Sequence, residues 1–249
     1  TVQSKGFQDQ LDAFLADCSG SSKCAWKIDG DPHAALRSLV ARVDREPVPA
    51  GGRSLYPGQL FFGIGEALYD RATWPLLARA LAAVAKGDGA SMLQLSDAYT
   101  DRDAAGDYSN LMAANLAYNC RDYAWPRDPD AFLADARASV ATAPDFGMDN
   151  LDTTLACAWF PPVDSGSAIA PFTAAGSPPI VVVATTGDPA TPYSDGVALA
   201  KQLSKGVLVT NVGEQHTGYG YSSCVRGYVD AYLTDLTVPP AGARCDDEG

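Results

Sequence analysis

The sequence predicts an α/β fold in which a helical region is followed by a small parallel sheet. Residues 180–184 and 207–212 are short, unbroken apolar runs, a pattern typical of parallel strands that are covered on both faces. Helical spacing between the two runs completes one β-α-β unit, whose crossover we expect to be right-handed. From Phe7 to about Ala141, apolar residues instead recur three or four positions apart, which indicates helices.

The helical region is predicted from three amphipathic patterns. Apolar residues at positions 7, 11, 14 and 15 share one face of the first helix. The second helix is entered at Thr73 and closed by Gly87, and the third begins at Asp128, which can cap it. Residues 45–58 form a loop rich in proline and glycine, and no strand pattern occurs in this half. We therefore predict that residues 1–160 form an all-helical domain.

The second predicted domain, residues 161–249, begins with a joint rich in proline, glycine and serine at 161–179. Asp195 can cap a helix that runs to Leu203 between the two strands, and a closing amphipathic helix follows at 224–233. Two parallel strands leave faces and edges that need partners, so we expect this sheet to require further strands from elsewhere.

Composition and charge exclude several classes of function. The chain has 18 Lys and Arg against 30 Asp and Glu, a formal charge of −12, so we exclude binding to nucleic acid. Its apolar runs are far shorter than the roughly 20 residues of a membrane span, so the sequence predicts neither a span nor a targeting segment. With no C-x-x-C motif and only two histidines, the sequence predicts no metal site.

Six cysteines at scattered positions favour disulfides and therefore an oxidising, secreted or cell-envelope location. The alternative is six buried free thiols in a cytosolic protein. Other pairings are possible, but pairing between neighbours in the sequence favours the bridges Cys18–Cys24, Cys120–Cys157 and Cys224–Cys245.

A residue with catalytic chemistry follows each predicted strand: Asp188 follows the first and His216 the second. Because the carboxyl ends of parallel strands meet at one edge of a sheet, both side chains should emerge there. An aspartate that accepts the imidazole N–H leaves the other ring nitrogen free to deprotonate a nucleophile. The one other histidine, His33, lies at a predicted helix start, where a surface or capping role is the simpler interpretation.

The segments around these two residues resemble a known family. GDPATPY at 187–193 and GEQHTGYG at 213–220 are similar to the Asp and His segments of the secreted tripeptidyl-aminopeptidase-like serine peptidases of the α/β-hydrolase superfamily. Upstream, GFQDQLDAFLADC, ALYDRATWPLLARAL and NCRDY resemble that family's helical lid. The resemblance covers nearly the whole chain. It implies the C-terminal part of an α/β-hydrolase fold preceded by an all-helical lid domain.

The resemblance also implies that Asp188 and His216 are the acid and base of a Ser–His–Asp triad. The sequence contains no G-x-S-x-G turn, which in the family lies in a preceding N-terminal portion, so we expect the serine on a separate chain. The implied function is a serine exopeptidase that hydrolyses peptide bonds near the substrate's amino terminus without a cofactor. An esterase or lipase of the same fold and a non-catalytic binding fragment are the alternatives.

An exopeptidase also needs a negative partner for the free amino terminus of its substrate. In the predicted lid, Glu66 and Asp122 are the candidates for this binding role. Each of them can equally be a solvated acid or one that pairs along its helix.

Overall fold

The computed structural model describes residues 2–148, 154–161 and 172–246, so part of the predicted joint at 161–179 lies outside the described residues. The first half is mainly helical, and its elements are α1 (Val2–Ser19), α2 (Pro32–Arg45), β1 (Val48–Ala50), β2 (Arg53–Leu55), α3 (Pro57–Leu68), η1 (Arg71–Thr73), α4 (Trp74–Ala85), α5 (Ala90–Tyr99), α6 (Leu111–Asp122), α7 (Pro129–Ser139) and η2 (Leu155–Trp159). The second half contains β3 (Ile180–Thr185), α9 (Tyr193–Gln202), β4 (Gly206–Asn211), α10 (Ser223–Asp235) and β5 (Arg244–Cys245).

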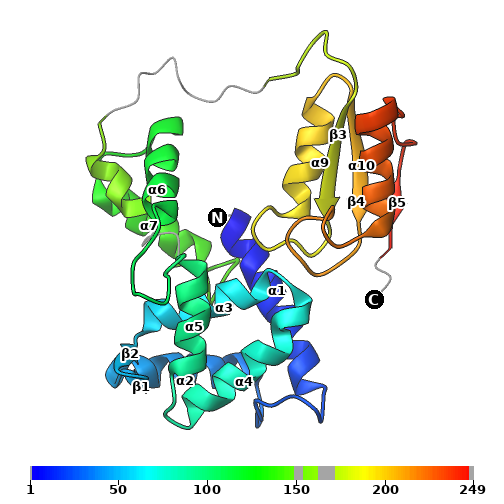
Figure 1. Cartoon of the computed structure of the whole chain (residues 1–249). Helices are drawn as coiled ribbons and strands as arrows, with labels where there is room; N and C mark the ends of the chain where they lie inside the picture. The colour runs from blue at the N-terminus through cyan, green and yellow to red at the C-terminus, as the bar shows by residue number, and fades with distance from the viewer. Residues whose placement is uncertain (1, 149–153, 162–171, 247–249) are drawn as a thin grey trace.

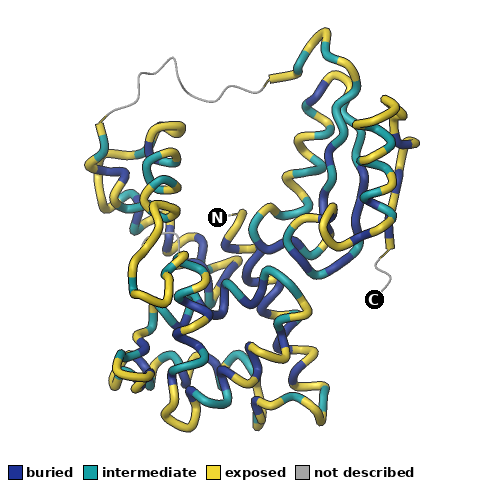
Figure 2. Tube along the Cα trace, viewed as in Figure 1, coloured by how far each residue is buried: buried dark blue, intermediate teal, exposed yellow. Residues whose placement is uncertain are grey.

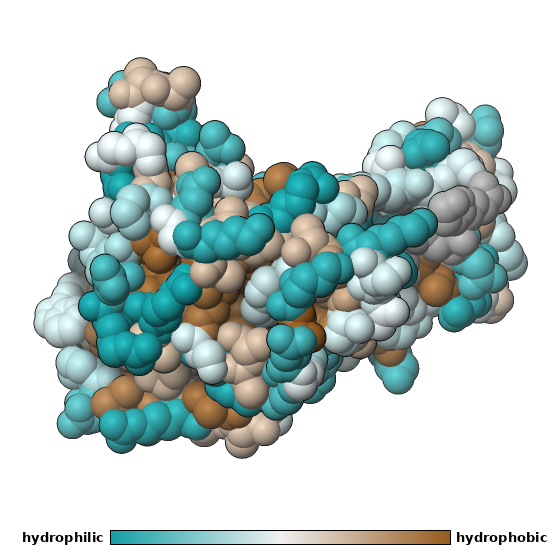
Figure 3. Space-filling view, turned by 90° about the horizontal axis from the view of Figure 1, so that it is seen from below, coloured by the Kyte–Doolittle hydropathy of each residue, from teal (hydrophilic) through white to brown (hydrophobic). Residues whose placement is uncertain are grey.

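Helices α1–α5 surround one apolar core, and α6 and α7 form a separate small lobe beside it (Figure 1). Phe14, Leu60 and Leu81 are almost completely buried in the main core, which Figure 2 shows as the dark blue interior of the helical region. Helices α3 and α5 approach closely at Gly63, where a Cβ atom would lie 2.7 Å from the carbonyl oxygen of Met92. Polar side chains cover most of the lower face of the molecule, with apolar side chains between them over the helical region (Figure 3).

The first half is not all-helical, which corrects the sequence prediction. The loop expected at 45–58 contains an antiparallel hairpin, in which Val48 pairs with Leu55 and Ala50 with Arg53. Gly51 and Gly52 form its turn with φ values of 58° and 87°, a backbone conformation that glycine adopts readily and that suits a two-residue hairpin. Three-residue strands are too short to show an alternating pattern, so composition alone suggested a loop.

Within its described residues, the second half forms a three-stranded parallel sheet in the order β3-β4-β5, with Val182 paired to Leu208. Helix α9 covers the face that carries Val182 and Ala184, because a Cβ at Gly196 would be 2.5 Å from that of Ala184. Helix α10 covers the opposite face, where Val225 packs with Val209. Both faces are therefore covered, as the apolar runs predicted.

Two details of the sheet differ from the prediction. Helix α9 begins at Tyr193, after Pro192, so Asp195 lies in the first turn and is not the cap. Proline fixes its own φ near the helical value and readily precedes or opens a helix, which explains the earlier start. The two-residue strand β5 was not predicted; it pairs with the end of β4, and Cys245 is tied to Cys224 at the start of α10.

One edge of β3 has no partner within the described residues. On the other edge, the backbone N–H groups of Ile180 and Thr186 donate to carbonyl groups at Lys205 and Asn211. Alternation along a strand then directs the N–H and C=O groups of Val181 and Val183 away from β4. The edge of β3 that faces away from β4 therefore presents backbone donors and acceptors to which a further strand can pair.

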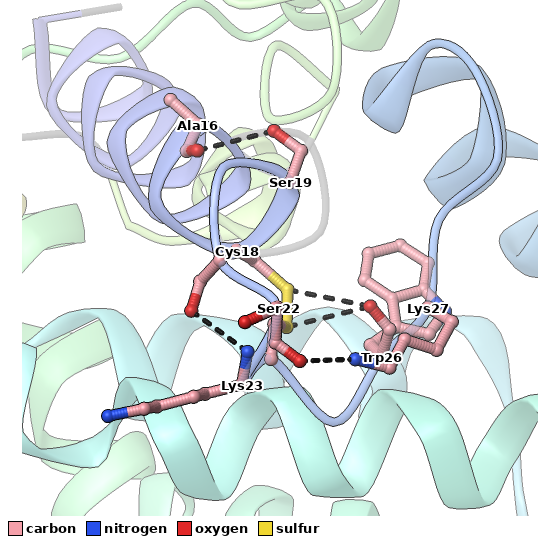
Figure 4. The surroundings of a disulfide bond; sticks show 9 residues. Ala16, Cys18, Ser19, Ser22, Lys23, Trp26 and Lys27 are labelled. Atoms are coloured by element: carbon pink, nitrogen blue, oxygen red, sulfur yellow. Dashed lines mark hydrogen bonds between the residues drawn. A yellow bond between two sulfur atoms is a disulfide. The ribbon is translucent and has the colours of Figure 1, made fainter.

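The three disulfides connect the cysteines that are neighbours in the sequence: Cys18–Cys24, Cys120–Cys157 and Cys224–Cys245, which confirms the favoured pairing. Figure 4 shows the first, which closes the loop after α1 with both sulfur atoms about 3.5 Å from the carbonyl oxygen of Trp26. Among the helices that the structure describes, none combines the length and apolar character of a membrane span.

Candidate active site

Asp188 and His216 meet at the carboxyl ends of β3 and β4. The Nδ1 atom of His216 lies 2.9 Å from Oδ1 and 3.0 Å from Oδ2 of Asp188. The two strands are adjacent and parallel, so loops that leave the same edge bring these side chains together although they are 28 positions apart. The aspartate is almost completely buried, whereas the histidine side chain remains 31% exposed.

The Asp188 carboxylate is held in place by four hydrogen bonds besides the one from His216. Its Oδ1 accepts from the backbone N–H groups of Ala190, at 2.9 Å, and Thr191, at 2.8 Å. Its Oδ2 accepts from the Thr191 hydroxyl, at 2.9 Å, and from the N–H of Thr217, at 3.0 Å. Burial raises the pKa of Asp188, but the hydrogen bonds from His216, Thr217 and Thr191 outweigh it, and the pKa lies below its ordinary value. The carboxylate therefore stays charged beside the ring.

His216 is arranged so that one ring nitrogen is free. With Nδ1 protonated and donating to Asp188, Nε2 carries the lone pair, and no hydrogen bond joins it to any described residue. The neighbouring Thr217 has a φ of 71°, a left-handed backbone that turns the chain sharply after the histidine and aims its N–H at Asp188. An imidazole in this state can accept a proton from a hydroxyl group placed beside it.

The helical region contributes directly to the position of the histidine. Its backbone N–H donates to the carbonyl oxygen of Tyr69, at 2.7 Å, and its ring lies edge-on to the Tyr69 ring with centroids 5.3 Å apart. The residues after Tyr69 continue the contact. Asp70 forms a β-bridge with Gln215, and the backbone N–H of Arg71 donates to the carbonyl oxygen of Glu214. Tyr69 follows α3, so the end of this helix is joined to the loop between β4 and α10 that carries His216.

Helix α1 packs against the loop between β3 and α9 that carries Asp188, called the Asp loop below. The Gln10 side chain donates to the carbonyl oxygen of Gly187, at 2.6 Å, and also to the carboxylate of Glu214. A Cβ at Gly187 would lie 2.1 Å from that carboxylate, so this position has no room for a side chain. Gln3 donates to the carbonyl oxygen of Ala190. Both loops of the site are therefore fixed from the helical side.

A cavity of about 900 Å³ lies beside Tyr69, lined by residues from α1, α3, α5 and α6 and from the segments that follow α6. Glu66, on the last turn of α3, contributes to the lining, and burial raises the pKa of its carboxyl group. Asp122 does not: it is exposed at the end of α6, although its neighbours Asn119 and Tyr123 line the cavity. Of the two predicted anchors, the structure brings only Glu66 to the cavity next to the Asp–His pair.

The remaining sequence candidates have structural explanations. The Nδ1 atom of His33 lies 3.1 Å from a carboxylate oxygen of Asp145, and its backbone N–H donates to Asp31, the cap of α2. No group of three or more acidic, histidine or cysteine side chains suited to a metal ion occurs in the part of the chain that the structure describes.

Two residues that sequence reasoning missed are Thr191 and Tyr69. Thr191 lies three positions after Asp188, where a hydroxyl can fold back onto the carboxylate, so its proximity was a usable signal. Tyr69 is 147 positions from His216 and only the tertiary structure brings it there.

Comparisons with known proteins point to one group of enzymes. Residues 143–245 match a protein family described as TAP-like protein, of the α/β-hydrolase type. The chain is 36% identical over 257 aligned residues to serine protease Hip1 of Mycobacterium tuberculosis and 35% identical to carboxylesterase B of the same species, in each case over 98% of this chain. It is 27% identical over 82% of its length to tripeptidyl aminopeptidase of Streptomyces lividans. The chain spans about half the length of the first two relatives, 49% and 48%, and 38% of the third.

Proposed function

We propose that this chain, whose residues 143–245 match the TAP-like family of α/β-hydrolases, forms the lid and the Asp–His part of a serine exopeptidase. Its substrate is a peptide with a free amino terminus, from which the enzyme releases short amino-terminal peptides. Relatives named as a serine protease and a tripeptidyl aminopeptidase support this reaction class.

The observation that carries the proposal is the Asp188–His216 pair with its free Nε2 atom. In the reaction, Nε2 accepts the proton of a serine hydroxyl as the serine oxygen bonds to the carbonyl carbon of the substrate. Asp188 holds the ring and stabilises the imidazolium that forms, and the imidazolium then gives the proton to the departing amine. Water, activated by the same nitrogen, releases the acyl group from the serine. The oxyanion donors come from the portion that carries the serine.

The serine is proposed to come from a portion of the enzyme outside residues 1–249. Three observations support this: the sequence has no G-x-S-x-G turn, the chain spans about half of its first relatives, and β3 has an unpaired edge in the described residues. A strand from the serine-bearing portion would pair with that edge and complete the sheet. Helices from the first half would then cover the completed site as a lid.

Ester hydrolysis is the second candidate function. A relative that is 35% identical is named carboxylesterase B, and a triad of this kind attacks esters and amides by the same steps. The two activities are separated by the hydrolysis rates of an amide and an ester with the same acyl group. A peptidase hydrolyses both substrates, whereas an esterase hydrolyses only the ester.

We also propose a secreted or cell-envelope location. Three disulfides within the described residues, with no free cysteine among them, are typical of proteins that fold in an oxidising compartment.

The proposed function is tested by fluorophosphonate labelling of the assembled enzyme, this chain together with its serine-bearing portion. We expect the His216→Ala variant to lose labelling by a factor of about 1,000 or more, because the serine is no longer deprotonated. The matched control is His33→Ala, which removes the other histidine and should label like the wild type. Equal labelling of the His216→Ala variant and the wild type would contradict the proposed function.

A further inference from the structure

Among the described residues that line the cavity beside Tyr69, one side chain is acidic and none is basic. That side chain is Glu66, which is half-buried, and within the described residues no lysine, arginine or histidine forms an ion pair with it. Burial without a cation is unfavourable for a carboxylate, which is why the pKa of Glu66 is raised. A positively charged ligand group that enters this cavity would relieve that cost.

We propose that Glu66 binds the free α-ammonium group of the peptide substrate and so selects unblocked amino termini, a role that rests on the proposed peptidase function. An ammonium group donates charge-assisted hydrogen bonds to a carboxylate, and these are stronger than bonds between neutral groups. Binding then restores the charged form of the carboxyl group, because a nearby opposite charge favours it.

Glu66 is also close to the Asp–His pair in the structure, because Tyr69 contacts both. Glu66 precedes Tyr69 by three positions on the same helix end, and the N–H of Tyr69 donates to the carbonyl oxygen of Glu66. The Tyr69 ring in turn contacts the His216 ring at 5.3 Å. Glu66 and His216 are therefore connected through a single residue, Tyr69.

The part of the cavity that α6 lines suits a short peptide. Asn119 Nδ2 donates to Asn115 Oδ1, at 3.1 Å, which leaves Asn115 Nδ2 and Asn119 Oδ1 to bond to a peptide backbone. The same helix contributes the apolar Leu111 and Met112. The volume of about 900 Å³ is within the usual range of small-ligand sites. The cavity therefore combines one anionic anchor with amide and apolar surfaces, which is the chemistry that recognises an unblocked peptide of a few residues.

The test uses the assembled enzyme and tripeptide p-nitroanilides, for example Ala-Ala-Ala, with a free or an acetylated amino terminus. We expect the wild type to hydrolyse the free form with a kcat/KM at least tenfold higher. In the Glu66→Gln variant this preference should disappear, mainly through an increase in KM. The Asp122→Asn variant is the matched control, because it makes the same charge change beside the cavity and should keep the preference.

Two results would overturn the assignment of Glu66. One is an equal kcat/KM of the wild type for free and acetylated peptides, which needs no variant. The other is an unchanged preference in a Glu66→Gln enzyme that labels with fluorophosphonate like the wild type. Fluorophosphonate labelling also separates this inference from the proposed function. A Glu66→Gln enzyme that labels normally but keeps its preference for free amino termini contradicts only the role of Glu66. Labelling that does not depend on His216 contradicts the hydrolase mechanism itself.

Discussion

The backbone N–H of His216 donates to the carbonyl oxygen of Tyr69, and the two rings lie edge-on at 88°. A residue at the end of helix α3 therefore holds His216, in the loop that follows β4. The helical region therefore helps to fix the orientation of the imidazole, in addition to the hydrogen bond with Asp188.

Removal of the Tyr69 ring should slow the reaction while the chain remains folded. Tyr69→Ala keeps the backbone hydrogen bond but removes the aromatic contact, which is worth about 1 kcal/mol, so we expect a roughly fivefold lower kcat. Tyr69→Phe retains the ring and should keep most of the activity. Steady-state kinetics of both variants decide the point, and equal kcat values for Tyr69→Ala and the wild type would show that the ring does not position His216.

Thr191 should act through its hydroxyl group. Thr191→Val preserves the shape but removes the hydrogen bond to Oδ2 of Asp188, so the carboxylate loses one of its fixed donors. We expect kcat to fall by about tenfold and Thr191→Ser to recover most of it. A serine variant as slow as the valine variant would contradict a role for the hydroxyl.

Asp188 should contribute to stability in a way that depends on pH. Its pKa in the folded chain lies below the value in the unfolded chain, so its contribution is fully present above the unfolded pKa, about 4. The contribution is lost as the pH falls through the folded pKa. The free energy of unfolding of wild type and Asp188→Asn, measured by denaturant titration, should therefore differ in slope below about pH 4 and run parallel above it. If the two plots of unfolding free energy against pH are parallel over the whole range, the pKa of Asp188 is not lowered by folding.

Gly187 should be intolerant of a side chain. Gly187→Ala would push a methyl group into the Glu214 carboxylate and the Gln10 amide, so we expect a loss of about 1–3 kcal/mol in the free energy of unfolding. Gly220→Ala is the control, because nothing lies within 4 Å of the added Cβ. Thermal unfolding of the two variants tests this, and similar midpoints would mean that the contact of α1 with the Asp loop is loose.

The sequence predicted the parts of the fold that follow from regular patterns. The apolar runs at 180–184 and 207–212 correspond to β3 and β4 within one residue, and parallel geometry was enough to bring Asp188 and His216 to one edge. The hairpin and β5 escaped prediction because strands of two or three residues show no periodicity. The contact of Tyr69 with His216 depends on how two distant segments pack, which no local pattern contains.

The location of the labelled serine tests the central claim most directly. After fluorophosphonate labelling of the assembled enzyme, the modified peptide is identified by mass spectrometry in the wild type and in the His216→Ala variant. We expect the wild type to carry the label on a serine outside residues 1–249 and the variant to carry none. A label on a serine within residues 1–249, or a label that persists without His216, would contradict the account.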